Sequence, residues 1–407
     1  MDEMLKTDRN LIVELRHTLH AHPELSGKEN HTKLLLMNFI REHTGLSVTD
    51  MGRWFYAVYE PNCSDREPPV AFRADMDALP MSESLDISYT SVESGVSHKC
   101  GHDGHSAALA ALALMLEDDE RITRPVYLIF QSAEETGEGG KACASFLKGR
   151  GIHEVYAFHN LSGYPENAIM VRDCLTQYAS AGVRFRFTGR PSHAGTPERG
   201  INPASALAHL EIYAEQLMGK KTDRAGEISL GVTRETSSDD GEERASDGEE
   251  SRFVLITTVG INVGNEDFGI SPGEGSICFT LRAGSDEIME SVGKELVNEA
   301  KRLAELQGLT VNFSLTDVFP ATVNDPKCAA KVRKASGELG LRVVPMNKPW
   351  RPSEDFGWYL HECQGAMFYV GNGEDWPAPH QGDYDFNDRI LMTAPAVFLR
   401  LAETSYR

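Results

Sequence analysis

The sequence predicts an α/β protein whose largely parallel sheet is interrupted by an inserted α+β block. Over the first 179 residues, short apolar runs typical of buried strands alternate with helical segments, which is the pattern of a parallel sheet covered by helices. After residue 180 polar and apolar residues alternate instead, as in half-exposed strands. The 407 residues are enough for two or three domains.

Residues 11–43 predict helix. Apolar residues recur there with helical spacing on both sides of the polar stretch HPELSGKE, residues 22–29, which interrupts the helix. The short apolar run Val70–Phe72 then predicts a buried strand. An Ala/Leu-rich helix follows a cysteine-containing loop, and Ser106 is its candidate N-cap.

Two further buried strands are predicted at 126–130 and 155–159. Each of the three strands is followed by, or ends in, side chains of types that can bind metals. Asp75 and Asp77 follow the first strand, Glu134 and Glu135 follow the second, and His159 ends the third. Ligand sites of open α/β sheets lie outside the carboxyl ends of the strands, so these side chains are expected to meet there.

Residues 180–318 predict the α+β block. Strands are predicted at 182–195, 252–264, 276–284 and 309–319, and amphipathic helices at 202–218 and 287–308. Asn202 is the candidate cap of the first helix, with Pro203 at its first position.

The final segment, 319–407, predicts a strand at 365–371 and a closing helix at 389–403. We therefore predict one domain from residues 1–179 and 319–407, and an inserted domain from residues 180–318. The stretch 237–251 is acidic and without periodicity, which predicts a flexible solvated loop.

The composition excludes several classes of partner. With 61 acidic and 40 basic residues the formal net charge is −21, which repels nucleic-acid backbones and anionic membrane surfaces. No run approaches the roughly 20 apolar residues of a membrane helix, and the acidic N-terminal segment does not resemble a signal peptide. Seven cysteines without framework spacing favour a reducing compartment, so we expect a cytoplasmic protein.

The stretch CGHDGH, Cys100 to His105, allows two kinds of chemistry. Cys100 could be a nucleophile with His102 or His105 as its base. That hypothesis leaves the paired glutamates and two more histidines without a role. A metal site uses them, because a bridging thiolate gives each of two ions about three protein ligands and leaves positions for water. The candidate ligands are Cys100, His102, Glu135, His159 and His380.

The adjacent glutamates suit a division of roles. Neighbouring side chains point in different directions, so Glu135 can bind metal while Glu134 faces water and acts as the general base. Asp75 or Asp77 is predicted to orient a ligand imidazole, as carboxylates behind metal sites commonly do.

Seven longer motifs occur in order along the chain: RHTLHAHPELS, FRADMDALP, CGHDGHSAALA, FQSAEETGEGG, SHAGTPERGINPASAL, SEDFGWYL and HQGDYDF. With these motifs the chain resembles metallopeptidases of family M20, in the amidohydrolase branch that includes aminoacylase-like enzymes, hippurate hydrolases and aminobenzoyl-glutamate hydrolases. The resemblance extends over nearly the whole chain. It implies a zinc-peptidase-like catalytic domain with a mixed, largely parallel sheet, and an inserted ferredoxin-like lid that mediates dimerisation.

The resemblance also implies roles for single residues. The five candidate ligands match the family's metal ligands, and Glu134 matches its catalytic base. His193 matches a lid histidine that reaches the partner subunit's active site and stabilises the oxyanion. Arg282 matches an arginine that can hold the free carboxylate of the substrate, a task for which a guanidinium is well suited.

Two positions depart from the family pattern. Gly269 stands where relatives carry a substrate-binding asparagine, and Asn262 or Asn265 is the candidate replacement. Gln381 follows His380 where relatives have a second histidine. Both departures affect the prediction of the substrate more than the prediction of metal binding.

The sequence thus predicts a homodimeric, metal-dependent hydrolase that cleaves the amide bond of N-acyl or N-aroyl amino acids or of dipeptides, small molecules with a free carboxylate. Thiolate ligation favours zinc, and mixed nitrogen and oxygen ligation also admits manganese, cobalt or nickel. Two alternatives remain open: an amidase with Cys100 as nucleophile, and a non-catalytic relative that binds metal or small ligands.

Overall fold

The computed structural model describes residues 2–63, 66–117, 121–218, 220–222, 228–230 and 252–406. The acidic loop predicted at 237–251 lies outside the described residues. The chain forms two compact units, the first from Met1–Thr176, Thr322–Lys348 and Glu354–Arg407, and the second from Gln177–Ala321 and Pro349–Ser353. Within the described part of the chain, every helix is too short or too polar to span a bilayer.

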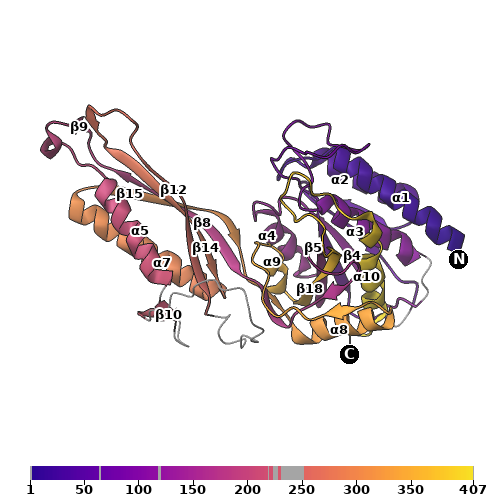
Figure 1. The fold of residues 1–407 in the computed structure, drawn as a ribbon. Coiled ribbons are helices and arrows are strands. Elements are labelled where there is room, and N and C mark those ends of the chain that lie inside the picture. The colour runs from indigo at the N-terminus through magenta and orange to yellow at the C-terminus, as the bar shows by residue number, and fades with distance from the viewer. Residues whose placement is uncertain are drawn as a thin grey trace. The chain divides into compact units, whose positions relative to one another are not determined.

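The first unit is built on an eight-stranded mixed sheet (Figure 1). Its spatial order is β1 (Ser47–Asp50), β2 (Phe55–Tyr59), β4 (Val126–Gln131), β3 (Val70–Asp75), β5 (Glu154–Ser162), β18 (Gln364–Gly373), β6 (Ile169–Met170) and β17 (Val343–Val344). The four central strands, β4, β3, β5 and β18, are mutually parallel. The fold predicted from the sequence, an α/β unit with a mixed and largely parallel sheet, is confirmed.

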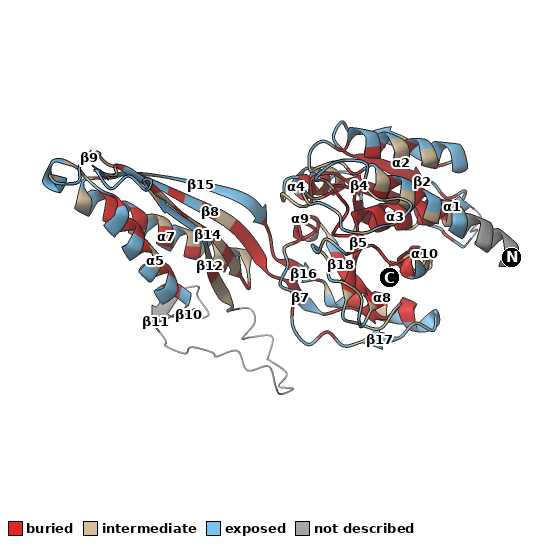
Figure 2. Ribbon diagram, turned by 45° about the horizontal axis from the view of Figure 1, so that its top comes forward, coloured by how far each residue is buried: buried red, intermediate tan, exposed pale blue. Residues whose placement is uncertain are grey.

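Helices cover both faces of this sheet. They are α1 (Asp2–Ala21), α2 (Asn30–His43), α3 (His102–Glu117), α4 (Gly139–Ala144), α8 (Pro326–Glu338), α9 (Gly357–Leu360) and α10 (Thr393–Glu403). Successive residues of the central strands point to opposite faces, so Phe72 and Leu128 join one apolar core while Ala71 and Ile129 join another. Figure 2 shows the strands buried along most of their length, as a sheet between two helical layers requires.

The shorter elements connect these layers. They are η1 (Ser145–Leu147), η3 (Asp388–Ile390) and the small ribbon of β7 (Cys174–Gln177) with β16 (Thr322–Asn324).

The second unit has ferredoxin-like topology. Its main elements follow the order β8 (Ala179–Thr188), α5 (Ala204–Met218), β12 (Val254–Val263), β14 (Glu274–Ala283), α7 (Asp286–Gln307) and β15 (Thr310–Phe319). The antiparallel sheet has the spatial order β12-β14-β8-β15. The β-α-β-β-α-β order with this pairing is the ferredoxin-like arrangement. The α+β, ferredoxin-like fold predicted for this block is therefore confirmed.

Short strands and a turn complete this unit. They are β9 (Ser192–His193), η2 (Pro197–Arg199), β10 (Lys220–Thr222), β11 (Ile228–Leu230) and β13 (Ile270–Ser271).

Local signals located some element boundaries and missed others. The strand predicted at 182–195 ends at Thr188, and the closing helix predicted from residue 389 begins at Thr393. Asn202 accepts a hydrogen bond from the backbone N–H of Ala204 at 2.9 Å and caps α5, as predicted. Ser106 is not the cap of α3, because that helix already begins at His102 and Ser106 donates to the carbonyl of Asp75 at 2.6 Å. His159 does not end its strand either, since β5 continues to Ser162.

Candidate metal centre

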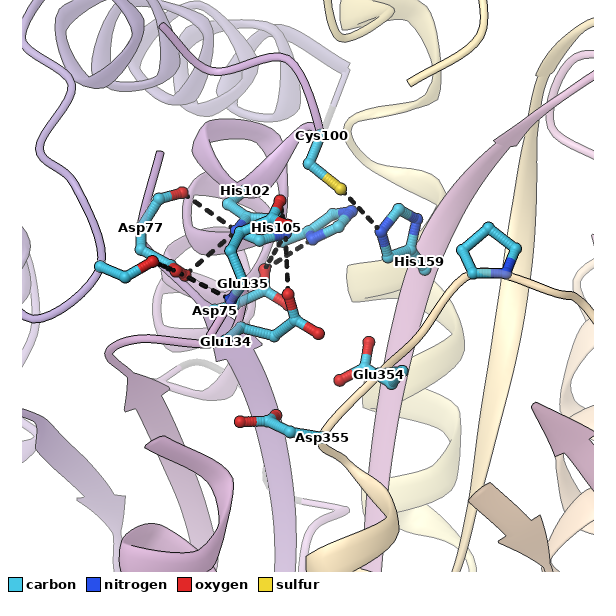
Figure 3. Close-up of polar contacts among 12 residues, drawn as sticks. Asp75, Asp77, Cys100, His102, His105, Glu134, Glu135, His159, Glu354 and Asp355 are labelled. Atoms are coloured by element: carbon cyan, nitrogen blue, oxygen red, sulfur yellow. Dashed lines mark hydrogen bonds and ion pairs between the residues drawn. The ribbon is translucent and has the colours of Figure 1, made fainter. Parts of the chain in front are cut away.

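Three segments of the first unit deliver potential metal ligands to one place (Figure 3). Cys100 and His102 stand at the start of α3, Glu135 follows β4, and His159 lies in β5. β3, β4 and β5 are parallel neighbours, so their carboxyl ends share one edge of the sheet. The convergence predicted from the strand ends is therefore present among the described residues.

Donor atoms from these segments lie close enough to share an ion. The Cys100 Sγ and His159 Nε2 atoms are 3.3 Å apart. Cys100, His102 and His159 form one group whose donor atoms all lie within 4.8 Å of one another, and all three residues are buried.

A second group shares the same thiol. Cys100, Glu135 and His380 also bring their donor atoms within 4.8 Å of one another. His380 Nε2 is 3.6 Å from Glu135 Oε1, and His102 Nε2 is 3.7 Å from that same oxygen. Cys100 thus belongs to two three-donor groups.

Two donor atoms in this cluster are buried without a hydrogen-bond partner among the described residues, His102 Nε2 and Glu135 Oε1. Buried polar atoms are normally satisfied, and an orphan pair facing each other across 3.7 Å indicates a ligand between them. Thiol, imidazole and carboxylate donors suit zinc and related divalent ions. The residues present therefore fit a metal.

The electrostatics of the cluster also favour a cation. Burial and the carboxylates of Glu135 and Glu134 raise the pKa of the Cys100 thiol well above its usual value. Burial, Glu354 and Glu135 raise the pKa of Glu134 in the same way. For His102, burial lowers the pKa, but the nearby Asp75 and Asp77 outweigh it and raise the pKa to about 10. A divalent ion bound here would place positive charge beside these groups. It would therefore lower the pKa values that the carboxylates and burial raise.

A strained turn positions the two glutamates. Ala133 has a positive φ of 54°, a conformation that costs an alanine about 1 kcal/mol. Glu29 holds the turn by accepting the backbone N–H of Ala133 at 2.7 Å. The backbone N–H of Glu135 donates to Asp77 Oδ2 at 3.0 Å. Glu134 and Glu135 are thereby fixed in different directions from adjacent positions.

Asp75 and Asp77 make their shortest histidine contacts with different residues. Asp77 Oδ1 lies 3.2 Å from His102 Nδ1, a contact that would orient this imidazole toward a metal. Asp75 instead lies 2.7 Å from His105 Nδ1 and pairs with Arg73 at 2.6 Å.

A buried ionic network near Glu134 was not predicted from the sequence (Figure 3). Arg73 contacts Glu354 at 3.0 Å and Asp355 at 2.8 Å, and all three side chains are almost fully buried. Gln131 donates a further hydrogen bond to Asp355 at 2.8 Å. The motifs FRAD and SEDF contained these residues, but nothing local indicated that two segments 282 residues apart would pair.

The remaining predicted site residues belong to the second unit. His193 lies in β9 and is exposed, and the backbone N–H of Ala194 donates to the carbonyl of Gly269 at 2.9 Å. Arg282 lies in β14 opposite Ser180 of β8. Their roles toward a substrate stay predictions.

Comparison with known proteins agrees with this geometry. The family model described as peptidase family M20/M25/M40 matches residues 71–404. The chain belongs to this family. The family resemblance noted in the sequence motifs is therefore confirmed, and the protein is a metallo-hydrolase acting on amide or peptide bonds.

Several curated relatives of this family member are similar over most of their length. A putative amidohydrolase, YhaA, of Bacillus subtilis is 26% identical over 97% of this chain and 95% of its own. Thermostable carboxypeptidase 1 of Saccharolobus solfataricus is 29% identical over 91% and 88%, respectively. Hippurate hydrolase of Campylobacter jejuni is 25% identical over 96% and 95%.

Solved structures share the fold of this family member. A putative aminohydrolase from methicillin-resistant Staphylococcus aureus superposes with a TM-score of 0.81 at 24% identity, covering 98% of this chain and 97% of that one. A dinuclear metal-binding M20 peptidase of Bacillus subtilis, YxeP, gives a TM-score of 0.77 at 21% identity, covering 98% of both chains.

Proposed function

We propose that the protein hydrolyses the amide bond of N-acyl or N-aroyl amino acids, or of dipeptides, with two divalent metal ions. The observation that supports this most directly is the sharing of Cys100 between two three-donor groups. The residues that would hold the ions are Cys100, His102, Glu135, His159 and His380. Each of the two groups would offer three protein donors to an ion and would leave room for water and substrate, which is the open coordination of a catalytic site.

Glu134 is the proposed general base. It is buried beside the ligands, and its Oε2 lies 3.9 Å from His102 Nε2. Divalent ions held there would polarise the substrate carbonyl as Lewis acids and would lower the pKa of a water toward neutrality. Glu134 takes a proton from the attacking water and delivers it to the leaving nitrogen, so cleavage of the C–N bond releases a carboxylic acid and an amine.

His193 and Arg282 are proposed to stabilise the oxyanion and to hold the substrate carboxylate. They lie toward opposite ends of the lid sheet, because Arg282 pairs with Ser180 near the start of β8 while His193 follows the end of β8 at Thr188 (Figure 1). The eight residues between these points span about 27 Å. One small substrate cannot touch both residues of one copy, so a partner subunit has to supply one of them.

A homodimer would meet this requirement. β12 is an edge strand of the antiparallel sheet in the second unit. Its Val259 and Ile261 are 62% and 50% exposed. An exposed apolar edge is a surface that proteins normally cover, and a second copy of the same strand is the occupant that we propose.

The cysteine thiols indicate both the kind of metal and the cellular compartment. Thiolate ligation favours zinc, and the mixed nitrogen and oxygen ligands also admit manganese, cobalt or nickel. The buried thiols of Cys100, Cys143 and Cys328 are not in disulfides, which supports a reducing environment such as the cytoplasm.

A chelator experiment tests the proposed function. Purified protein is assayed against N-acetyl and N-benzoyl amino acids and dipeptides before and after dialysis with EDTA, and its metal content is measured in parallel. We expect loss of hydrolysis on chelation and recovery with Zn²⁺ or Mn²⁺. Full activity in metal-free protein would favour the alternative with Cys100 as nucleophile, and metal binding without turnover of any substrate would favour the non-catalytic alternative.

A further inference from the structure

One carboxylate in the buried network near Glu134 has an oxygen without a partner. Arg73 contacts Glu354 Oε1 at 3.0 Å, and the backbone N–H of Phe356 donates to the same oxygen at 3.0 Å. The other oxygen, Oε2, is buried and has no hydrogen-bond partner among the described residues. Buried polar atoms are normally satisfied, so a free oxygen in this position indicates a place for a ligand.

The adjacent Asp355 shows that the fold can satisfy a carboxylate completely in this network. Its Oδ1 accepts hydrogen bonds from Arg73 and Gln131, both at 2.8 Å. Its Oδ2 accepts from Gln131 at 2.8 Å and from the backbone N–H of Gly140 at 2.7 Å. Asp355 therefore has a structural role, whereas Glu354 keeps a free acceptor.

The network also carries more negative than positive charge. Besides Glu354, the Arg73 guanidinium contacts two other buried carboxylates. These belong to Asp75 at 2.6 Å and Asp355 at 2.8 Å. Burial raises the pKa of Glu354 more than Arg73 lowers it, so the negative charge of Glu354 is not fully compensated. A positively charged ligand beside Oε2 would offset this excess.

The Glu354 carboxylate faces the proposed general base. Figure 3 shows the carboxylates of Glu354 and Glu134 pointing toward each other. Among the charged groups around Glu134, Glu354 has the largest electrostatic effect, as expected of a close neighbour. Both residues belong to the first unit, so this arrangement lies within one compact part of the chain. A group that receives a proton from Glu134 would therefore come within reach of Glu354.

Hydrolysis of an amide produces such a group. After water adds to the carbonyl carbon, the C–N bond breaks and the nitrogen takes a proton through Glu134. The new carboxylic acid then releases its proton and the amine takes one up, so the products are a carboxylate and an ammonium ion. Positive charge and N–H donors thus develop at the nitrogen, and a carboxylate oxygen is an acceptor that stabilises both.

We propose that Glu354 is a further catalytic residue, whose free Oε2 accepts a hydrogen bond from the leaving nitrogen and stabilises the ammonium product. This inference rests on the proposed amidohydrolase function and deepens it. The acceptor favours cleavage at nitrogen over cleavage at oxygen, because an ester releases an alcohol that stays neutral.

The test compares an amide that the wild type hydrolyses with its ester analogue, such as N-benzoylglycine with O-benzoylglycolate. The ratio of their kcat values is measured for the metal-loaded wild type, Glu354→Gln and Asp355→Asn. Glu354→Gln should lower kcat for the amide roughly tenfold or more beyond any fall for the ester, since it removes a hydrogen bond to a charged group. Asp355→Asn, the matched control in the same network, should keep the wild-type ratio.

The Glu354→Gln protein should fold, because Arg73 keeps its contacts to Asp75 and Asp355. Thermal unfolding and metal content are measured in the same preparation. An equal fall of kcat for amide and ester would show that Glu354 only supports the structure. Loss of metal would show that Glu354 is a metal ligand instead. Either result would overturn the proposal.

A binding measurement separates this inference from the function on which it rests. Titration calorimetry of the metal-loaded protein with glycine and with glycolate should show tighter binding of glycine by the wild type and loss of that preference in Glu354→Gln. If no amide is hydrolysed but this pattern holds, the amidohydrolase function is wrong and the ammonium site stands. Equal binding of glycine and glycolate by the wild type, or an unchanged preference in Glu354→Gln, would overturn the ammonium site even where amide hydrolysis is confirmed.

Discussion

At the scale of single residues, the adjacent glutamates have distinct surroundings. Glu135 Oε1 lies within 3.7 Å of both His102 and His380. Glu134 Oε2 lies 3.9 Å from His102, and burial and the charge of Glu354 raise the pKa of Glu134. The turn at Ala133 creates this difference, and it is the basis for assigning metal binding to one glutamate and proton transfer to the other.

Replacing Glu134 by Gln should remove the base and keep the shape of the site. We expect kcat to fall by roughly 10³-fold, a typical loss for a general base, with metal content unchanged. Steady-state kinetics and elemental analysis of the same preparation check both parts. Glu138→Gln is the control, because Glu138 is exposed and its carboxylate pairs with Arg53 at 3.4 Å, away from the metal centre. Substantial turnover by the Glu134→Gln protein would show that Glu134 is not the general base.

At the scale of elements, α1 is tied to the segments that carry the ligands. His20 Nδ1 lies 2.8 Å from Asp103 of α3, and His20 Nε2 lies 2.9 Å from Glu83. Arg16 adds contacts to Asp103 at 3.2 Å and to Asp385 at 2.7 Å. Asp103 follows the ligand His102, so this buried network holds the start of α3 in place.

The same network predicts a pH dependence of stability. Burial lowers the pKa of His20, but the hydrogen bonds to Asp103 and Glu83 outweigh it and raise the pKa to about 9. Because the pKa of His20 is higher in the folded state than its unfolded value of 6.5, protonation of His20 stabilises the fold. This contribution is complete below pH 6.5 and disappears as the pH rises through 9. It amounts to at most roughly 3 kcal/mol.

Calorimetric unfolding at pH 6 and pH 9 measures this contribution. The wild type should lose more stability across this interval than His20→Gln does. His17→Gln is the matched control on the same helix, because His17 is partly exposed and contacts only Asp388 among the carboxylates described. Equal losses in wild type and His20→Gln would show that His20 is not the responsible group.

Helix α3 also depends on close packing at one glycine. A Cβ atom at Gly104 would lie 2.2 Å from the ring of Phe386, which is fully buried. Gly104→Ala should therefore destabilise the protein by roughly 1–3 kcal/mol through overpacking.

Gly293 of α7 provides the opposite control, since no described atom beyond its chain neighbours and its own helix backbone lies within 4 Å of its Cβ position. Gly293→Ala should stabilise its helix by roughly 0.5–1 kcal/mol, because alanine has the higher helix propensity. Unfolding midpoints of the two variants should move in opposite directions, and a shift of the same sign in both would contradict the packing argument.

At the scale of the whole molecule, the separation of His193 from Arg282 makes the proposed dimer testable. In a homodimer that exchanges His193, a His193→Ala subunit keeps an intact metal site and a Glu134→Gln subunit keeps an intact His193. Each variant alone should be inactive. Mixing equal amounts after reversible dissociation should restore about a quarter of wild-type activity, because half of the dimers are mixed and each has one complete site.

Sedimentation of the mixture confirms that dimers have formed. Absence of recovery in a dimeric mixture would mean that His193 serves the site of its own subunit or no site.

The sequence by itself determined the elements and the kinds of ligand. Helical periodicity located α1, α2 and α7, the apolar runs located β3, β4 and β5, and Asn202 marked the start of α5, because these signals depend on residues near one another in the chain. Strand alternation with helices also predicted that Asp75, Glu135 and His159 would gather at one sheet edge.

Only the tertiary structure decided which of those residues meet. It assigned Asp77 to His102 and Asp75 to His105, placed Arg73 against Glu354, and set Arg351 beside Arg282 across 69 positions of sequence. These contacts depend on how distant segments pack, and local propensity contains no information about such pairings. For the same reason Ser106 resembled a helix cap, although α3 already begins at His102.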